Sequence, residues 1–139
     1  MLLREKIIKI SAIIPTFNRA EVLPRAIDSI INQTISCHEI IVIDDGSTDK
    51  TFEILKEYIE NKQIVYKKTE NKGVSAARND AIKLASGDWI SFLDSDDEWL
   101  PIKNEKQLEI LNHYMSREIF NDELKYYLQE AVNNYFNLS

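Results

Sequence analysis

Two apolar segments of this chain end in runs of carboxylates, and this pattern constrains the fold more than any other feature. Residues 39–43 run into Asp44-Asp45-Gly46, and residues 89–93 run into Asp94-Ser95-Asp96. Short apolar segments rich in β-branched residues are typical of buried strands. Because amphipathic helical patterns separate these segments, we expect an α/β domain with a mostly parallel sheet and helices on both faces.

The expected elements alternate along the chain. The predicted strands are residues 7–14, 39–43, 64–66 and 89–93. The predicted helices lie between Asn18 and Gln33, around residues 52–59, over residues 74–85, and from Pro101 onward. Asn18 is expected to cap the first helix with Pro24 in its first turn, and Pro15 to close the first strand.

Residues 116–139 differ in character from the rest of the chain. Apolar side chains recur there at helical spacing: Ile119, Phe120, Leu124, Leu128, Val132, Tyr135 and Phe136. This spacing predicts one or two amphipathic C-terminal helices, whose apolar faces need a surface to cover on this chain or on a partner. We therefore expect an α/β domain over residues 1–115 and a helical tail over 116–139, through which the chain could form a homo-oligomer.

Composition narrows the function. With 17 Lys and Arg against 23 Asp and Glu, the net charge is −6, which argues against a nucleic-acid partner and fits a metal site better than a bare phosphate site. Cys37 is the only cysteine, so no intrachain disulfide is possible. No apolar run has membrane-spanning length, and residues 1–6 are too charged for a signal peptide. The expected location is the cytoplasm, with peripheral membrane association left open.

The first carboxylate cluster is Asp44-Asp45-Gly46-Ser47. A turn with helix-capping residues would explain it on backbone grounds alone. Two adjacent carboxylates repel each other, however, and a turn needs only one of them. A carboxylate at a strand end can also accept a hydrogen bond from a base or sugar, or help to bind a cation.

The second cluster is Asp94-Ser95-Asp96-Asp97-Glu98. An acid-rich helix N-terminus would explain Asp97 and Glu98. It explains Asp94 and Asp96 poorly, because they directly follow a buried strand. Two carboxylates spaced in this way can share Mg²⁺ or Mn²⁺, which prefer oxygen ligands and often bind substrate phosphates. Since ligands bind beyond the carboxyl ends of parallel strands, the two clusters predict a metal-diphosphate site there.

Other candidates are weaker. Arg78, in the helix after Gly73, could be an ordinary surface residue, or it could approach a diphosphate or brace the carboxylates. His38 and His113 lie in different contexts, which argues against a shared transition-metal site. With only three glycines the chain has no glycine-rich phosphate loop, so P-loop and dinucleotide-binding functions are disfavoured.

Several motifs in series resemble those of the family 2 glycosyltransferases. They are Ala12-Ile13-Ile14-Pro15-Thr16-Phe17-Asn18-Arg19, Gln33-Thr34, the segment from Glu39 to Asp49, Asn71-Lys72-Gly73, Ala77-Arg78-Asn79, and Phe92-Leu93-Asp94-Ser95-Asp96-Asp97. Their order and spacing match over about residues 8–112. A series of this kind is far more specific than any single motif.

The resemblance implies a GT-A fold, a Rossmann-like three-layer α/β/α arrangement. It also implies inverting transfer from a nucleotide-sugar, usually UDP-linked, with Mn²⁺ or Mg²⁺ as cofactor. The implied nucleotide-sugar-binding residues are Pro15, Thr16, Phe17, Asp44, Asp45, Arg78, Asp94 and Ser95. Within this set Phe17 would pack near the base and Asp45 would bond the uracil. In the DXD motif of the family, Asp96 would bind the metal directly and Asp94 would face the ribose or donor sugar.

The resemblance leaves the acceptor side unassigned. Family members are as a rule at least about 100 residues longer than this chain, and the additional part binds the acceptor and carries the general base. No motif of that part follows Asn112. The sequence gives no geometric reason to assign either Asp97 or Glu98 as the base. The acceptor is expected to be a saccharide or a lipid-linked saccharide. The alternative to a transferase is a donor-binding fragment or subunit without transfer activity of its own.

Signalling receiver domains and haloacid-dehalogenase phosphatases also set acids at strand ends near a metal. A receiver domain would carry its acidic pair after the first strand, which here ends in Pro15-Thr16. A phosphatase would need Thr where Glu98 stands. Both readings are therefore disfavoured.

Overall fold

The computed structural model describes residues 7–115, 130 and 137–138. Its centre is a parallel sheet with the strand order β3-β2-β1-β4. The strands are β1 (Ile10–Thr16), β2 (Glu39–Asp44), β3 (Val65–Lys68) and β4 (Trp89–Phe92). The helices are α1 (Leu23–Ile31), α2 (Thr51–Glu60), α3 (Val74–Leu84) and α4 (Lys103–Met115). Two short strands, β5 (Glu98–Trp99) and β6 (Asn137–Leu138), pair antiparallel to each other.

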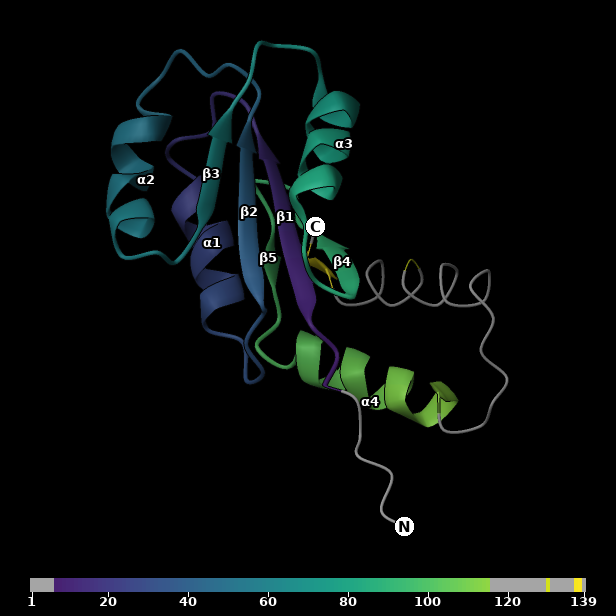
Figure 1. The fold of residues 1–139 in the computed structure, drawn as a ribbon. Coiled ribbons are helices and arrows are strands. Elements are labelled where there is room, and N and C mark those ends of the chain that lie inside the picture. Colours follow the sequence, from purple (N-terminus) through teal and green to yellow (C-terminus); the bar gives the residue numbers. More distant parts are fainter. Residues whose placement is uncertain (1–6, 116–129, 131–136, 139) are drawn as a thin grey trace.

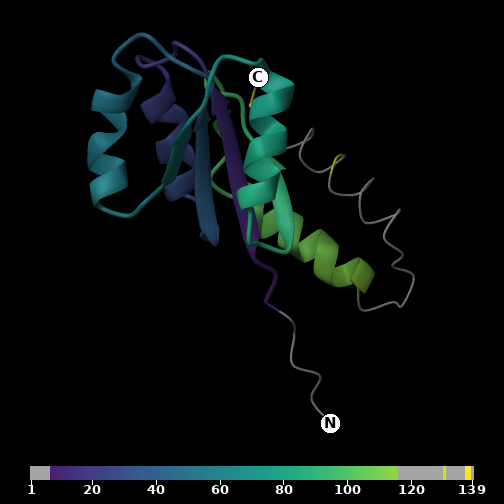
Figure 2. The same ribbon diagram turned by 45° about the horizontal axis from the view of Figure 1, so that its top comes forward.

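The sheet separates two layers of helices, as the alternation of elements predicts. Helices α1 and α2 lie on one face and α3 lies on the other (Figure 1), and the rotated view keeps this arrangement (Figure 2). The core on the first face consists mainly of Ala12, Ile14, Leu23, Ala26, Ile27, Ile30, Ile40, Val42 and Leu55. The core under α3 consists of Ile13, Ile41, Ile43, Ala77 and Ala81. Each fully buried Ile or Leu side chain contributes about 1.5–3 kcal/mol to stability.

The prediction that Pro15 closes the first strand is wrong. β1 continues to Thr16, and Pro15 pairs with Ile43 of β2. The main-chain N–H and C=O groups of alternate residues point toward the same neighbouring strand. Those of Ile13 point toward β4, so the nitrogen of Pro15 points to that side too. Pairing with β4 ends where Ile13 meets Phe92, so the N–H that proline lacks has no strand partner at that level.

The prediction that Asn18 caps the first helix is also wrong. α1 begins at Leu23 without a side-chain cap, although Pro24 does lie in its first turn. Asn18 adopts a left-handed conformation, with φ of 50°, and its side-chain oxygen accepts the N–H groups of Thr48 and Asp49 at 2.8 and 3.3 Å. Asn18 therefore joins the loop after β1 to the loop after β2.

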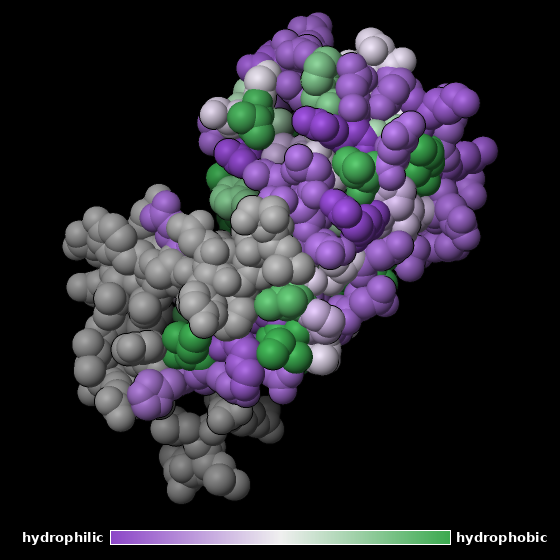
Figure 3. All heavy atoms as spheres, turned by 180° about the vertical axis from the view of Figure 1, so that it is seen from behind, coloured by the Kyte–Doolittle hydropathy of each residue, from purple (hydrophilic) through white to green (hydrophobic). Residues whose placement is uncertain are grey.

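The predicted C-terminal helices lie mostly outside the described residues; within that region Asn137 and Leu138 form β6. In the described part of the chain, no helix combines the length and the hydropathy of a membrane-crossing segment. On the face seen in Figure 3, the described hydrophobic residues stand singly or in small groups among hydrophilic ones. Among the exposed apolar residues that the structure records, Phe52 lies on α2, Ile82 lies on α3 with Val74 and Leu84, and Leu100 lies with Ile102 between β5 and α4.

Candidate functional site

Loops at the carboxyl edge of the sheet enclose an open hollow of about 430 Å³. Its lining consists of Pro15, Thr16, Phe17, Arg19, Asp45, Val74, Ala77, Arg78, Asp94, Ser95 and Asp96. Among the predicted site residues only Asp44 is absent from this lining. Another hollow, of about 310 Å³, lies beside His38 and Glu39 at the start of β2 and contains none of the predicted residues. The predicted motifs therefore converge on one place.

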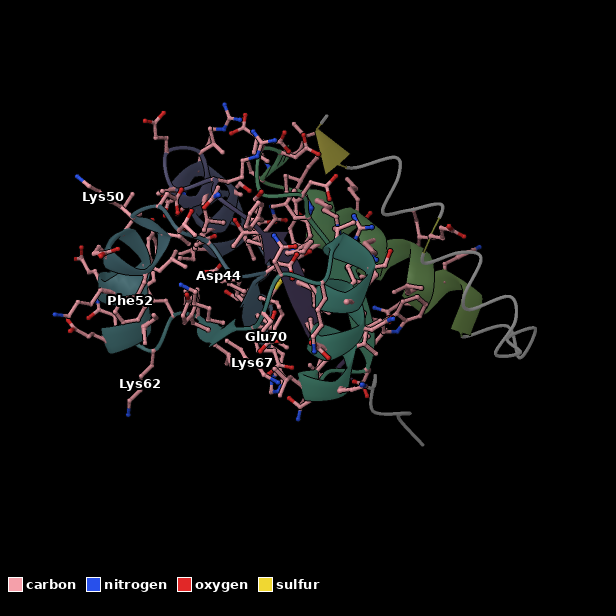
Figure 4. All side chains as sticks on the ribbon, turned by 90° about the horizontal axis from the view of Figure 1, so that it is seen from above. Asp44, Lys50, Phe52, Lys62, Lys67 and Glu70 are labelled. Carbon is pink, nitrogen blue, oxygen red and sulfur yellow. The ribbon has the colours of Figure 1, made fainter. Side chains whose placement is uncertain are left out.

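Asp44 is fully buried at the end of β2, and protein groups occupy its carboxylate. One oxygen accepts the Ser47 N–H at 2.8 Å, and the other accepts the Tyr66 hydroxyl at 2.7 Å. Burial, together with this bond to Asp44, raises the pKa of the Tyr66 hydroxyl. Seen from above, Asp44 lies among the central elements, whereas Lys50 and Lys62 point away from them (Figure 4). Asp44 therefore shapes the loop that carries Asp45 and does not line the hollow.

Asp45 lines the hollow and also holds the following turn. Its two carboxylate oxygens accept the main-chain N–H groups of Lys72 and Gly73 at 2.8 and 2.9 Å. Gly46 has a φ of +85°, and a Cβ atom there would lie 3.0 Å from the Asn71 nitrogen. Only glycine allows the turn to approach this closely. Asp45 thereby fixes the start of α3, where Arg78 follows one turn later.

Arg78 reaches across the hollow from α3. Its Nη2 donates to the Asp94 carboxylate at 2.9 Å, and its guanidinium lies 5.8 Å from the centre of the Phe92 ring. Among the alternatives for this residue, the geometry matches the one in which Arg78 braces a carboxylate. The pair is partly exposed, so its own contribution to stability is small. Its effect is to fix the direction of the Asp94 side chain.

The acidic segment after β4 forms a turn rather than a helix N-terminus, since the Asp97 N–H donates to the Asp94 carbonyl at 3.0 Å. Burial, with the neighbouring charges of Asp96 and Asp94, raises the pKa of the Asp97 carboxyl; the positive charge of Arg25 acts in the opposite direction. The Asp96 side chain is exposed, and no described residue donates a hydrogen bond to its carboxylate. Three acidic side chains therefore crowd one turn, with Asp96 open to a ligand.

Two buried polar atoms at the hollow have no partner among the described residues. They are the Thr16 hydroxyl oxygen and the Arg78 Nε. An unpaired buried polar group costs about 1–3 kcal/mol, so native structures rarely retain one without a ligand or water to satisfy it. Water or a polar ligand in the hollow would satisfy both atoms.

The residues fit a divalent cation that shares its ligands with a phosphate. Within residues 7–115, 130 and 137–138, no three His, Cys, Asp or Glu side chains converge into a complete protein ligand set. Mg²⁺ and Mn²⁺ commonly take only one or two carboxylates from the protein and the remainder from phosphate and water. Asp96, with Asp94 in the same turn, supplies oxygen donors of this kind.

Sequence reasoning missed three residues of the lining: Arg19, Val74 and Ala77. Arg19 and Ala77 stand in motifs named above, but neither had an assigned role. Val74 and Ala77 lie one helical turn apart at the start of α3. The parallel topology was the available signal for them, because it brings the first turn of each crossover helix to the carboxyl edge.

Comparison with known proteins identifies the family of the chain. The glycosyl transferase family 2 model matches residues 11–130, so the chain belongs to this family. It is 36% identical over 122 residues to UDP-Glc:alpha-D-GlcNAc-diphosphoundecaprenol beta-1,3-glucosyltransferase WfaP of Escherichia coli. The aligned region covers 87% of this chain and 47% of WfaP. The predicted family is therefore confirmed.

Solved structures agree on the fold. S. aureus TarS 1-349 in complex with UDP-GlcNAc matches with a TM-score of 0.66 and 28% identity, over 76% of this chain and 31% of that one. The mannosyltransferase PcManGT from Pyrobaculum calidifontis, in complex with GDP-Man and Mn²⁺, matches with a TM-score of 0.67 and 25% identity. This match covers 73% of this chain and 31% of PcManGT. These likenesses confirm the predicted α/β class and GT-A fold.

The chain spans only part of its relatives. Against five curated relatives at 36% to 46% identity, it covers 13% to 47% of the length of the relative. The matched region is therefore a minor part of each of those proteins.

Proposed function

We propose that this chain binds a nucleotide-diphospho-sugar, UDP-linked, and forms the donor side of an inverting glycosyltransferase. The observation that carries the proposal is the convergence of three separate motifs, around Phe17, Asp45 and Asp94-Ser95-Asp96, on one hollow at the carboxyl edge of the sheet. TarS and PcManGT, which share the fold, are described with UDP-GlcNAc and with GDP-Man and Mn²⁺. Family membership supports the reaction class.

The nucleotide is assigned to the side of the hollow formed by β1 and β2. Phe17 is partly exposed and offers an apolar ring surface to a base. The Thr16 hydroxyl has no partner among the described residues, and each Asp45 oxygen accepts one described N–H and keeps a second lone pair, so both would supply polar contacts for the base or ribose. We assign Pro15 to the wall of this pocket, and Asp44 to its support from behind.

The diphosphate and metal are assigned to the opposite side of the hollow. Asp96 would bind Mn²⁺ or Mg²⁺ directly, with Asp94 and Ser95 facing the ribose or the donor sugar. When bound, the cation would neutralise charge on the leaving diphosphate. Arg78, held by Asp94, would add positive charge and a planar set of N–H donors on the same side.

The acceptor hydroxyl needs a base within hydrogen-bond reach, and we assign that role to no residue of this chain. The proposed acceptor is a saccharide or a lipid-linked saccharide; WfaP, by its name, acts on one carried by diphosphoundecaprenol. Because the chain covers a minor part of its relatives, donor binding without transfer is the second candidate function.

The proposed location is the cytoplasm or the cytoplasmic face of a membrane. A single cysteine, Cys37, is compatible with a reducing compartment of this kind.

Calorimetric titration tests the proposal. UDP is titrated into the purified chain with Mn²⁺ and again with EDTA, and GDP serves as the control nucleotide. We expect saturable binding with Mn²⁺ that EDTA weakens at least about tenfold, because the diphosphate loses its shared cation. We also expect UDP to bind more tightly than GDP.

Two results would contradict parts of this proposal separately. A folded chain that binds UDP equally with Mn²⁺ and EDTA would refute the metal site but keep the nucleotide site. A folded chain that binds neither nucleotide would refute both. Hydrolysis or transfer of a UDP-sugar by this chain alone would decide against donor binding as its only activity.

A further inference from the structure

The segment between β4 and α4 carries the acidic turn but has little sheet pairing to fix it. The chain there leaves β4 at Phe92 and next forms a strand only at the two residues of β5. Main-chain N–H and C=O groups in such a segment need other partners. Helix α1 and the turn that ends it supply them, through three polar side chains four residues apart: Arg25, Ser29 and Gln33.

The far part of this segment is held by two of these side chains. The Ser29 hydroxyl oxygen accepts the Trp99 N–H at 3.0 Å. The Gln33 side chain donates to the Leu100 carbonyl at 2.7 Å and accepts the Asn104 N–H at 3.0 Å. Arg25 and Ser29, at i and i+4, lie on one face of α1, and Gln33, just beyond the end of this helix, continues the polar row along the segment through its bonds to Leu100 and Asn104.

Arg25 forms the end of this row nearest the hollow. Its Nη2 donates to the main-chain carbonyl of Asp96 at 2.7 Å, and its Nε lies 4.0 Å from the Glu98 carboxylate. The bond joins positions 71 residues apart in the sequence. It leaves the Asp96 carboxylate unoccupied, because the contact is to the backbone.

We propose that Arg25 is a positioning residue that holds the Asp96 carboxylate in place for the divalent cation. The inference rests on the proposed function. Arg78 of α3 grips the same turn from the other face of the sheet, through the Asp94 side chain. Two arginines from opposite helical layers therefore bracket the turn, and their charges offset the repulsion among its carboxylates.

The test compares Arg25→Met with Lys56→Met. Both substitutions remove one positive charge, and Lys56 lies on α2, where its described ion pair is with Glu60 in the same helix. Amide hydrogen exchange of Asp97 and Trp99 is followed by NMR without metal, and UDP affinity is then measured with Mn²⁺. For Arg25→Met we expect exchange about tenfold faster and affinity about tenfold weaker, since a charge-assisted hydrogen bond is lost. Lys56→Met should change neither by more than about twofold.

Arg25→Lys separates charge from geometry. Lysine keeps the charge but not the planar fork, so it should recover only part of both effects. Unchanged exchange and unchanged affinity in Arg25→Met would overturn the inference, and so would equal losses in both methionine variants. Hydrogen exchange is measured without metal. Unchanged exchange in Arg25→Met therefore refutes the inference by itself, even where the unsubstituted chain does not bind Mn²⁺ and UDP. Weak Mn²⁺ and UDP binding by the unsubstituted chain would instead refute the proposed function.

Discussion

The two carboxylate clusters look alike in the sequence and differ in the structure. Each follows a buried strand and each reaches the same edge of the sheet. Asp44 is fully buried and accepts two hydrogen bonds, from Ser47 and Tyr66. Asp96 is exposed, and no described residue donates to its carboxylate. The carboxylates of the first cluster, Asp44 and Asp45, accept hydrogen bonds from the protein, whereas Asp96 of the second cluster presents carboxylate oxygens to the hollow.

The difference teaches that an acidic residue at a strand end can bind a ligand only where the surrounding loops leave its carboxylate without hydrogen-bond donors from the protein. β2 lies between two strands, and the turn that follows β3 folds back over its end, so N–H and O–H donors surround Asp44 and Asp45. β4 is followed by a turn whose contacts run mainly through the backbone. Stability should therefore depend on the first cluster, and metal binding on the second.

Asp44→Ala should have the largest effect on stability. It leaves the Ser47 N–H and the Tyr66 hydroxyl without their acceptor in a buried site, and we expect a loss of about 3 kcal/mol in the free energy of unfolding. Urea denaturation followed by circular dichroism measures this loss. A change below about 0.5 kcal/mol would mean that the cluster is not structural.

Asp96→Ala should produce the opposite result. The free energy of unfolding should change by less than about 0.5 kcal/mol, because no described residue depends on that carboxylate. The affinity for UDP with Mn²⁺ should fall by about 100-fold, at the upper end of the losses seen when groups that support a metal site are removed. Calorimetry on Asp96→Ala beside Asp97→Ala checks the assignment of the ligand. An equal loss in both variants would assign the effect to total charge.

The smallest expected effect is a pH dependence of stability that comes from Tyr66. Its hydroxyl pKa is raised in the folded state, so above about pH 10 the unfolded chain loses this proton first. Stability should therefore fall as pH rises beyond 10. Asp44→Asn removes the charge next to the hydroxyl and should make this fall shallower. A fall of equal steepness in Asp44→Asn and in the unsubstituted chain would contradict the coupling.

Most of the fold could be predicted because it follows from periodicity. Runs of Ile and Val alternate with amphipathic helices, and this pattern requires a buried parallel sheet with helices on both faces. The errors lie at element ends. Pro15 is tolerated inside β1 because β4 stops short of it, and Asn18 bonds to Thr48 rather than to a helix. Both depend on which segments become neighbours, and local sequence does not contain that information.

The candidate site could be predicted as a set of residues but not as a set of contacts. Motif order identified Phe17, Arg78 and Asp96, and they do line one hollow. The burial of Asp44 could not be read from the sequence, and neither could the row that begins at Arg25. Each depends on a partner more than 20 residues away, Tyr66 for Asp44 and Asp96 for Arg25. The roles of these residues in binding stay predictions for the experiments above.

The sequence by itself determined that this chain forms a parallel α/β sheet with acids at two strand ends, because side-chain periodicity and turn chemistry act over a few residues. Only the tertiary structure decided which acid became part of the framework and which stayed open to a ligand. The availability of a carboxylate depends on the hydrogen-bond donors around it, and folding brings those donors together from distant parts of the chain.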